Sequence, residues 1–270
     1  MGQKIMFSVC LCSWDDLNYL KLLYSSFKKY TKLPCEFIVH DNGSEDGTEK
    51  WLQEKQIVYS RSEENLGVSA VNFAVEKAKY NFIVDINADM FFLPGWDIAL
   101  LKQIKKFESQ NIDKFIISSR LIEPIGNNPE YQIFNCGSDW ESFDEDKLLN
   151  YYFKIKANHE ESIQYSHPIC LSRKLWNDFG GADTGYQYGI ATDHDIPISA
   201  YEAGCRHFIE LAKPTIFHFS CKTVSKLPLN RLDGQKRFYD KWGITIEQFR
   251  HKMKIGQKYE KVSDNVFEGE

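Results

Sequence analysis

The sequence predicts an α/β fold built on a mostly parallel central sheet flanked by helices. Two observations support this fold class. Short β-rich runs alternate with helical patterns through the first half of the chain, as is typical of a parallel sheet covered on both faces. Polar clusters follow the ends of these runs, and ligands of such sheets bind beyond the carboxyl ends of the strands.

The first two strands enclose one clear helix. Residues 5–12 form an apolar, β-rich run that predicts the first strand. Apolar residues at positions 17, 20, 23, 24 and 27 have helical spacing, so we expect a helix over residues 17–30. Residues 36–40 predict the second strand, which ends at the turn-rich segment DNGSEDGT. Ser44 or Asp46 could cap the next helix, which runs through Trp51 and Leu52.

Five further elements complete the regular half of the chain. Residues 57–59 predict a short third strand, and residues 68–79 a helix with small residues on one face. Residues 82–86 form the fourth apolar strand. A helix over residues 95–108 and a fifth strand over residues 115–119 follow.

The second half is less regular. Residues 123–160 are rich in Asn, Asp, Glu and aromatic residues, and we expect an inserted, partly looped segment there. Regular structure is expected to resume near residues 166–171. From residue 222 the chain is basic and polar, with a helical piece around residues 237–242, so we divide it into a main domain (1–221) and a short C-terminal helical extension with a tail (222–270). The last residues, SDNVFEGE, are expected to be disordered.

Composition limits the class of protein. The chain has 270 residues, enough for one large domain or two small ones, and 43% of them are hydrophobic. The net charge of −5 argues against nucleic-acid binding, which normally needs a basic face. No run of 18 apolar residues predicts a transmembrane segment, although peripheral membrane association stays possible. Seven scattered cysteines without a Cys-x-x-Cys pair indicate reduced thiols and a cytoplasmic protein.

One strand end raises a chemical question. The apolar run FIVDI leads directly into Asn87-Ala88-Asp89. Burying a carboxylate costs several kcal/mol unless it is paired or bound to a metal. An exposed turn would explain the same residues. Three more polar clusters follow predicted strands (Ser13-Trp14-Asp15, Asp41-Asn42 and Asn65-Leu66-Gly67), and four such clusters favour a binding site.

Three segments of the chain together resemble the family 2 glycosyltransferases, which have the GT-A fold. They are FIVHDNGSEDGT, then ENLGVSAVNFAVEKAKYNFIVDINADMFFLPGW, then GGADTGYQYGIATDHDIPISAYEAG. Each motif is weak alone, but all three occur in the family's order and spacing over residues 5–220. The resemblance implies a Rossmann-like sheet and an inverting, metal-dependent transferase. It would move a sugar from a nucleotide sugar, with a UDP-sugar as the default, to a hydroxyl of a glycan or glycoconjugate.

Four positions depart from the family pattern. Asn87 stands where the first Asp of Asp-x-Asp is usual, and Thr192 replaces the Glu of the usual Glu-Asp pair. Val71 occupies the place of a common Arg, which leaves one diphosphate contact unassigned. The opening Pro-Thr-Tyr of the family is Cys12-Ser13-Trp14 here.

The resemblance implies a divalent ion, Mn²⁺ or Mg²⁺, held by Asp89 and His218. A divalent cation can neutralise a departing diphosphate, and Mg²⁺ is commonly held by one or two carboxylates plus substrate phosphates. His218 lies in the apolar run PTIFHFS, where a buried core histidine is an equally good reading. An imidazole ligand would suit Mn²⁺ better than Mg²⁺.

The donor-binding residues implied by the family are mainly at strand ends. Asp41 would contact the base or ribose of the nucleotide, although an Asp that starts a turn would look the same. The remaining donor-binding candidates are Ser13, Asn65, Gly67, Asn72 and Asn87.

The resemblance assigns the general base to Asp193, which would deprotonate the acceptor hydroxyl. Asp195 would orient the start of the helix or bind the acceptor. Two acids at a helix N-terminus also suit the helix dipole, so a purely structural role is the alternative.

Two other function classes stay open. A nucleotidyltransferase would normally carry a Gly- and Arg/Lys-rich loop after the first strand, and CSWDDLNYLK offers none. The protein could instead bind a nucleotide or sugar without catalysis, and Asn87 and Thr192 would then mark the loss of acidic residues from a former active site. The acceptor is not identified by the sequence. Residues 123–160 and the chain after residue 222 are expected to shape its pocket, and polysaccharide biosynthesis is a family-level expectation.

Overall fold

The computed structural model describes residues 6–126, 132–155, 160–186, 189–220, 222 and 231–267. The strands are β1 (Phe7–Ser13), β2 (Cys35–Asp41), β3 (Val58–Arg61), β4 (Phe82–Asp85), β5 (Met90–Phe92), β6 (Phe115–Glu123), β7 (Gln132–Ile133), β8 (Ile169–Ser172) and β9 (His207–His218). The helices are α1 (Leu17–Tyr30), α2 (Thr48–Glu54), α3 (Val71–Glu76), α4 (Trp96–Ser109), α5 (Glu145–Tyr152), α6 (Arg173–Asp178), α7 (Thr192–Glu202), α8 (Arg231–Trp242) and α9 (Ile246–Lys252).

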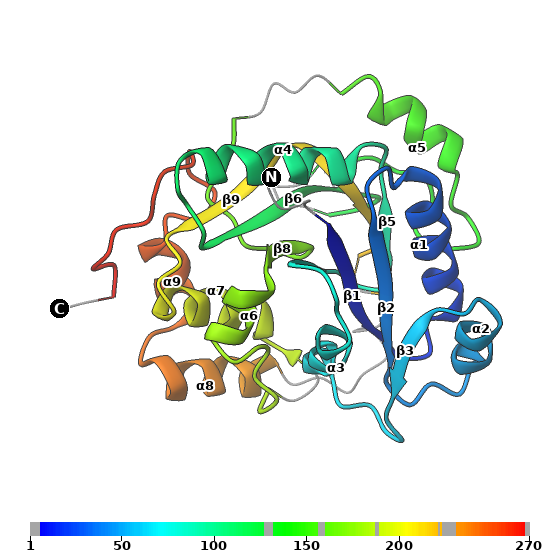
Figure 1. Ribbon diagram of the computed structural model, residues 1–270, viewed down its shortest axis with the longest axis horizontal. Helices are drawn as coiled ribbons and strands as arrows, with labels where there is room; N and C mark the ends of the chain where they lie inside the picture. The colour runs from blue at the N-terminus through cyan, green and yellow to red at the C-terminus, as the bar shows by residue number, and fades with distance from the viewer. Residues whose placement is uncertain are drawn as a thin grey trace.

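One sheet runs through the molecule in the order β3-β2-β1-β4-β8-β6-β9-β5, with β7 paired to β6 (Figure 1). The first four strands are mutually parallel, and β6 and β9 have the same direction. Only β8 and β5 run antiparallel to their neighbours in this path. The predicted α/β class with a mostly parallel, helix-flanked sheet is therefore confirmed.

Two hydrophobic cores lie on the two faces of the sheet. Side chains of β1 alternate between them, because successive residues of a strand point to opposite faces. Phe7, Val9 and Leu11 enter the core shared with α1, α2, α4 and α5. Cys10 enters the core shared with α3, α6, α7, α8 and α9. Figure 1 shows the two groups of helices on opposite sides of the strands.

The start of two helices differs from the expectation. The predicted helix over residues 68–79 is divided into a 3-10 turn, Val68–Ala70, and the short helix α3. Gly47 rather than Ser44 or Asp46 is the N-cap of α2, with a φ of +91° that favours glycine. Asp46 still accepts a hydrogen bond from the Thr48 amide at 3.1 Å.

The C-terminal tail is ordered where the structure describes it, so the expectation of disorder over the whole of SDNVFEGE was wrong. The Tyr201 hydroxyl donates to the carbonyl oxygens of Ser263 and Asp264 at 2.9 and 2.6 Å. The ring of Phe267 packs against Tyr201 and Phe249. Aromatic residues of α7 and α9 therefore hold the tail. This contact could not be predicted from the sequence, because the residues that form it are far apart along the chain. The domain boundary predicted at residue 221 lies outside the described residues.

Six cysteines are described, and all six are free thiols (Cys10, Cys12, Cys35, Cys136, Cys170 and Cys205). This agrees with the expected reduced state for those positions. Cys221 lies outside the described residues.

Candidate active site

The predicted polar clusters lie along the carboxyl edge of the sheet. Ser13 at the end of β1 is in register with Asp41 at the end of β2. His218 ends β9 and is in register with Met90, the residue after Asp89. Parallel strands place their carboxyl ends at one edge, which is why residues far apart in the sequence meet here.

The loop after β3 is held by an asparagine from the β2 cluster. Asn42 donates from Nδ2 to the Asn65 side-chain oxygen and to the Gly67 carbonyl, both at 2.9 Å. Its Oδ1 accepts from the Leu66 amide at 3.0 Å. Asn65 also accepts from the Gly67 amide, so its oxygen is engaged within the loop. Gly67 has a φ of +79°, which a side chain would strain.

Asp41 is fully buried and already has protein partners. Its carboxylate forms a salt bridge with Arg61 and accepts the Ser44 amide at 3.0 Å. Nearby Ser13 is also buried, and its hydroxyl has no hydrogen-bond partner among the described residues. A buried hydroxyl without a partner costs free energy, so this oxygen is available to a ligand.

The remaining two donor-binding candidates differ in exposure and contacts. Asn87 is exposed just beyond β4. Asn72 of α3 donates to the Ala182 carbonyl at 2.7 Å and accepts the Ala182 amide at 3.0 Å. Both polar ends of the Asn72 amide are therefore used to tie α3 to the loop before α7.

The two proposed metal ligands lie side by side. The Asp89 Oδ1 is 3.4 Å from the His218 Nε2, and both side chains are largely buried. The His218 Nδ1 makes a 2.6 Å hydrogen bond with Glu123 Oε1 at the end of β6. The second oxygen of Asp89 accepts the Lys222 amide at 2.8 Å.

The electrostatics of this trio are set by burial and by the two carboxylates. Burial lowers the pKa of His218, but Asp89 and Glu123 outweigh it and raise the pKa to about 10. Burial raises the pKa of Asp89, whereas the His218 charge and hydrogen bonds bring it below its usual range. Without a metal, the pair is therefore an imidazolium beside a carboxylate.

The donor set fits a divalent ion. A metal-bound histidine commonly donates its other ring N–H to a carboxylate, and Glu123 occupies that place on His218. The residues described here include no group of three His, Cys, Asp or Glu side chains placed to hold a metal. Two protein ligands leave positions for phosphate oxygens and water, as is usual for Mg²⁺ in nucleotide-using sites.

Asp193 is the more accessible of the two acids at the start of α7. Its side chain is 53% exposed, and its Oδ1 is 3.8 Å from the His194 Nε2. The preceding Thr192 is buried, and its hydroxyl finds no partner within the described ranges. An exposed carboxylate can reach the hydroxyl of an incoming substrate, which the role of general base requires.

Asp195 points instead into a network that holds α8. Tyr186 and Trp242 donate to its Oδ1 at 2.9 and 2.8 Å. The Lys241 ammonium is 2.9 Å from the same carboxylate and also contacts Asp183. These contacts suit the predicted orienting role, and that role stays a prediction.

Asp195→Ala is expected to lower the free energy of unfolding by about 1–3 kcal/mol, because it leaves the buried Tyr186 hydroxyl and the Trp242 indole N–H without their acceptor, whereas Lys241 keeps Asp183. Urea denaturation measures this change. Asp240→Ala is the matched control, since this exposed α8 carboxylate pairs only with Lys236 among the described contacts. Equal losses in the two variants would contradict the proposed anchoring of α8.

Three residues of the site were not predicted from the sequence. Glu123 was treated only as the start of an irregular segment. Asp85 lies buried within β4, and His167, which precedes β8, hydrogen-bonds to it at 2.9 Å. A carboxylate inside the apolar run FIVDI was the available signal, because such a group needs a partner. The partner itself is 82 positions away.

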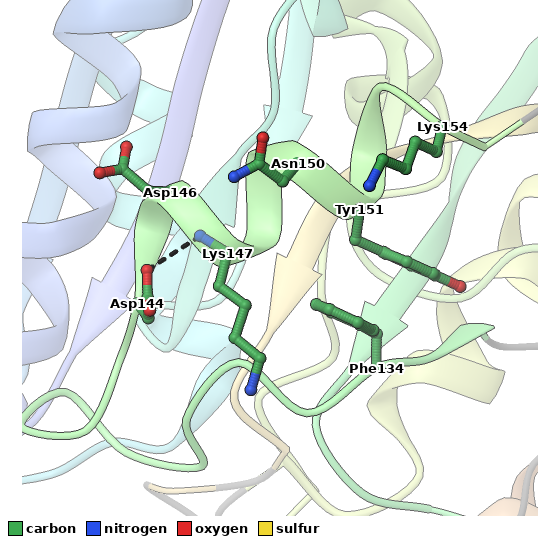
Figure 2. Close-up of a pocket in the computed structure, with 7 residues that line it drawn as sticks. All are labelled: Phe134, Asp144, Asp146, Lys147, Asn150, Tyr151 and Lys154. Carbon is green, nitrogen blue, oxygen red and sulfur yellow. Dashed lines mark hydrogen bonds between the residues drawn. The ribbon is translucent and has the colours of Figure 1, made fainter.

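A separate hollow of about 450 Å³ lies on α5, within the predicted insertion. Figure 2 shows the rings of Phe134 and Tyr151 face to face beside polar side chains of this helix. The two ring centres are 3.9 Å apart. None of the predicted site residues lines this hollow.

Comparison with known families gives a clear match. Residues 8–170, more than half of the chain, match the model of the family described as "Glycosyl transferase family 2". No curated protein sequence matches this chain. No helix in the described part of the chain is both long and apolar enough to cross a bilayer.

Among solved structures, the chain is similar to TarS of S. aureus. One TarS fragment superposes with a TM-score of 0.57 at 15% identity, covering 92% of this chain and 72% of that chain. The fragment in complex with UDP-GlcNAc gives a TM-score of 0.56 at 16% identity, covering 87% and 64%. A longer TarS chain gives 0.57 at 14% identity, and only 43% of its length is covered. At such identities the similarity establishes the fold, which is GT-A.

Proposed function

This chain belongs to glycosyl transferase family 2, and from that membership we propose an inverting, metal-dependent transfer from a nucleotide sugar to a glycan or glycoconjugate hydroxyl. The observation that carries the proposal is the pairing of Asp89 with His218 at 3.4 Å on the edge of the sheet, with Asp193 exposed at the start of α7. Asp89 and His218 can bind an ion that stabilises the negative charge of a leaving group, and Asp193 can accept a proton.

A UDP-sugar is the proposed donor. TarS, which has the same fold, has been crystallised with UDP-GlcNAc and with UDP. This supports UDP as the nucleotide, and the sugar and the acceptor stay proposals. Ser13, Asn65, Gly67 and Asn87 supply polar atoms at the edge where the nucleotide would lie.

The proposed reaction is a direct displacement. Asp193 takes the proton from the acceptor hydroxyl, and the acceptor oxygen forms a bond to the anomeric carbon of the donor. The bond from that carbon to the β-phosphate oxygen breaks at the same time, and the nucleoside diphosphate leaves. Attack from the side opposite the leaving group inverts the anomeric centre.

Asp89 and His218 would hold the divalent ion. Such an ion stabilises the negative charge that develops on the departing diphosphate. Glu123 keeps the His218 ring in place through its Nδ1 and increases its basicity. Mn²⁺ and Mg²⁺ are both consistent with one carboxylate and one imidazole, and the imidazole favours Mn²⁺.

Product stereochemistry tests the proposed mechanism. An α-linked donor should give a β-linked product in the NMR spectrum of the purified glycoside. A product that retains the donor's anomeric configuration would exclude direct displacement by Asp193. A donor-hydrolysis assay separates the enzyme from a non-catalytic nucleotide-binding protein, because a binding protein would release no nucleotide.

Asp41→Asn is expected to raise the donor KM roughly tenfold, which corresponds to about 1.4 kcal/mol. Asp41 fixes the Ser44 amide and Arg61 beside the proposed nucleotide site, and the change removes its charge. Steady-state kinetics measure the donor KM and calorimetric titration measures the UDP affinity, with thermal unfolding as the check on folding. If the folded variant binds UDP as tightly as the parent, Asp41 only shapes the turn.

The acceptor side is proposed from position alone. The segment 123–160 and the chain after residue 222 are expected to contact the acceptor, since the donor motifs lie elsewhere. Action in the cytoplasm, peripheral membrane association and a role in polysaccharide biosynthesis stay predictions.

A further inference from the structure

A buried acid on β4 has no role in the reaction described so far. Asp85 is 5% exposed and lies between apolar neighbours in the strand that leads to Asn87 and Asp89. A buried carboxylate needs a compensating partner. Asp85 is the last residue of β4, at the carboxyl edge of the sheet where the predicted site residues lie, so the identity of its partner is relevant to catalysis.

The partner of Asp85 is a histidine from the neighbouring strand. Asp85 is in register with Ile169, and His167 lies two residues before Ile169, at the same edge of the sheet. The His167 Nε2 is 2.9 Å from the Asp85 Oδ2. The His167 side chain is 17% exposed, and within the described part of the chain its Nδ1 makes no hydrogen bond.

The charges of Asp193 and His218, one from each part of the proposed site, both act on His167. Burial lowers the pKa of His167, but the Asp85 charge and hydrogen bond and the Asp193 charge outweigh it and raise the pKa. The charge of His218 opposes this shift. Charged groups on β4, α7 and β9 therefore all influence this imidazole, and the acidic ones favour its charged form.

A cation at this place has a chemical use. A nucleoside diphosphate leaves with roughly three negative charges, because a terminal phosphate carries about −1.5 to −2 at neutral pH. A divalent ion balances two of them. A fixed donor aimed at the developing charge stabilises the transition state without reorganising during the reaction.

We propose that His167, held in place by Asp85, is a further catalytic residue whose Nδ1–H donates a hydrogen bond to a β-phosphate oxygen of the departing nucleoside diphosphate. This inference rests on the proposed function. His167 keeps its proton throughout, since the acceptor proton goes to Asp193. The Asp85 carboxylate selects the orientation of the ring through Nε2 and leaves Nδ1 for the ligand.

The test compares two nucleotides that differ by the β-phosphate. In His167→Gln, the affinity for UDP should fall roughly tenfold or more, as expected for a lost hydrogen bond to a charged group. The affinity for UMP should stay within about twofold. The kcat should fall by at least as much as the UDP affinity, because the contact strengthens as the phosphate leaves. Calorimetry in Mg²⁺ and steady-state kinetics give the three values.

Two further variants distinguish a direct hydrogen bond from His167 to the phosphate from a general structural effect of the substitution. Asp85→Asn preserves the volume but removes the charge that holds the ring, so it should weaken UDP binding in the same direction and by less. His207→Gln is the matched control, because this histidine also has a ring nitrogen bonded to a neighbour, Tyr259, at the opposite edge of the sheet. It should leave the ratio of UDP to UMP affinity unchanged.

Three results would overturn the inference: equal losses of UDP and UMP affinity, unchanged UDP affinity in a folded His167→Gln protein, or an unchanged kcat. If that variant does not fold, a crystal structure of the parent with UDP and Mg²⁺ decides. An Nδ1 within about 3.2 Å of a β-phosphate oxygen supports the proposal, and a longer distance rejects it. Failure of the parent itself to bind UDP would instead contradict the proposed function.

Discussion

Asp193→Asn is expected to lower kcat by about two to four orders of magnitude, the usual effect of a positioned general base. The amide nearly preserves the shape of the carboxylate but cannot take the proton of the acceptor hydroxyl. Because the side chain is 53% exposed and makes no buried ion pair in the described structure, the folded state should tolerate the change. Steady-state kinetics with saturating donor measure kcat, and UDP affinity should stay close to that of the parent.

The controls for this variant come from the same helix and from the surface. Asp195→Asn is expected to cost less activity than Asp193→Asn, because Asp195 faces Tyr186 and α8. Asp240→Asn changes an exposed carboxylate of α8 and should leave kcat unchanged. If the kcat of Asp193→Asn stays within a few-fold of the parent value, Asp193 is not the general base. Asp195 or a residue of the segment 123–160 would then be the candidate.

Removing divalent ions is expected to abolish transfer. Without the ion, His218 is held protonated by Asp89 and Glu123, and the departing diphosphate loses its main counter-charge. EDTA should reduce the rate to background, and Mn²⁺ or Mg²⁺ should restore it. Since the ion must displace the His218 proton, its apparent affinity should rise with pH across the range below about 10. Full activity in EDTA would contradict the metal site.

Variants locate the ion within the site. Asp89→Ala and His218→Ala should each raise the metal concentration needed for half-maximal activity. Glu123→Gln should do so by roughly 10- to 100-fold, as is typical for loss of a residue that orients a metal ligand. Lys106→Gln, at an exposed ion pair with Glu161, is a surface control. Full activity of His218→Ala would show that His218 is a buried core residue and not a metal ligand.

The regular half of the fold could be predicted from local pattern. Helix α1 has the expected bounds, and the apolar run at β4 was placed within one residue. The spacing of apolar residues carries this information directly. Regular structure was expected near β8, but its antiparallel direction and the strand β5 were not anticipated, because strand direction depends on how the chain crosses the sheet and not on any local pattern. The same holds for α9 and for the packed tail on Tyr201.

The site was predicted as a set of residues but not as a set of contacts. The family motifs pointed to Asp89 and His218, and the structure places them 3.4 Å apart. Glu123 carries no motif, and only the fold brings it to His218. Asn72 shows the reverse case. It was assigned to the donor from its motif, whereas its amide is engaged by the Ala182 backbone. Long-range partners of this kind are set by topology, which a single sequence does not reveal.

The central claim is that this chain releases a nucleotide from a nucleotide sugar by transferring the sugar. The most direct measurement is nucleotide release from a panel of UDP-, dTDP- and GDP-sugars in Mn²⁺, with the Asp193→Asn protein assayed in parallel. We predict release of UDP from at least one UDP-sugar by the parent, and a rate lower by about two to four orders of magnitude in the variant. Release of no nucleotide from any donor in the panel, or equal release by parent and variant, would contradict the account.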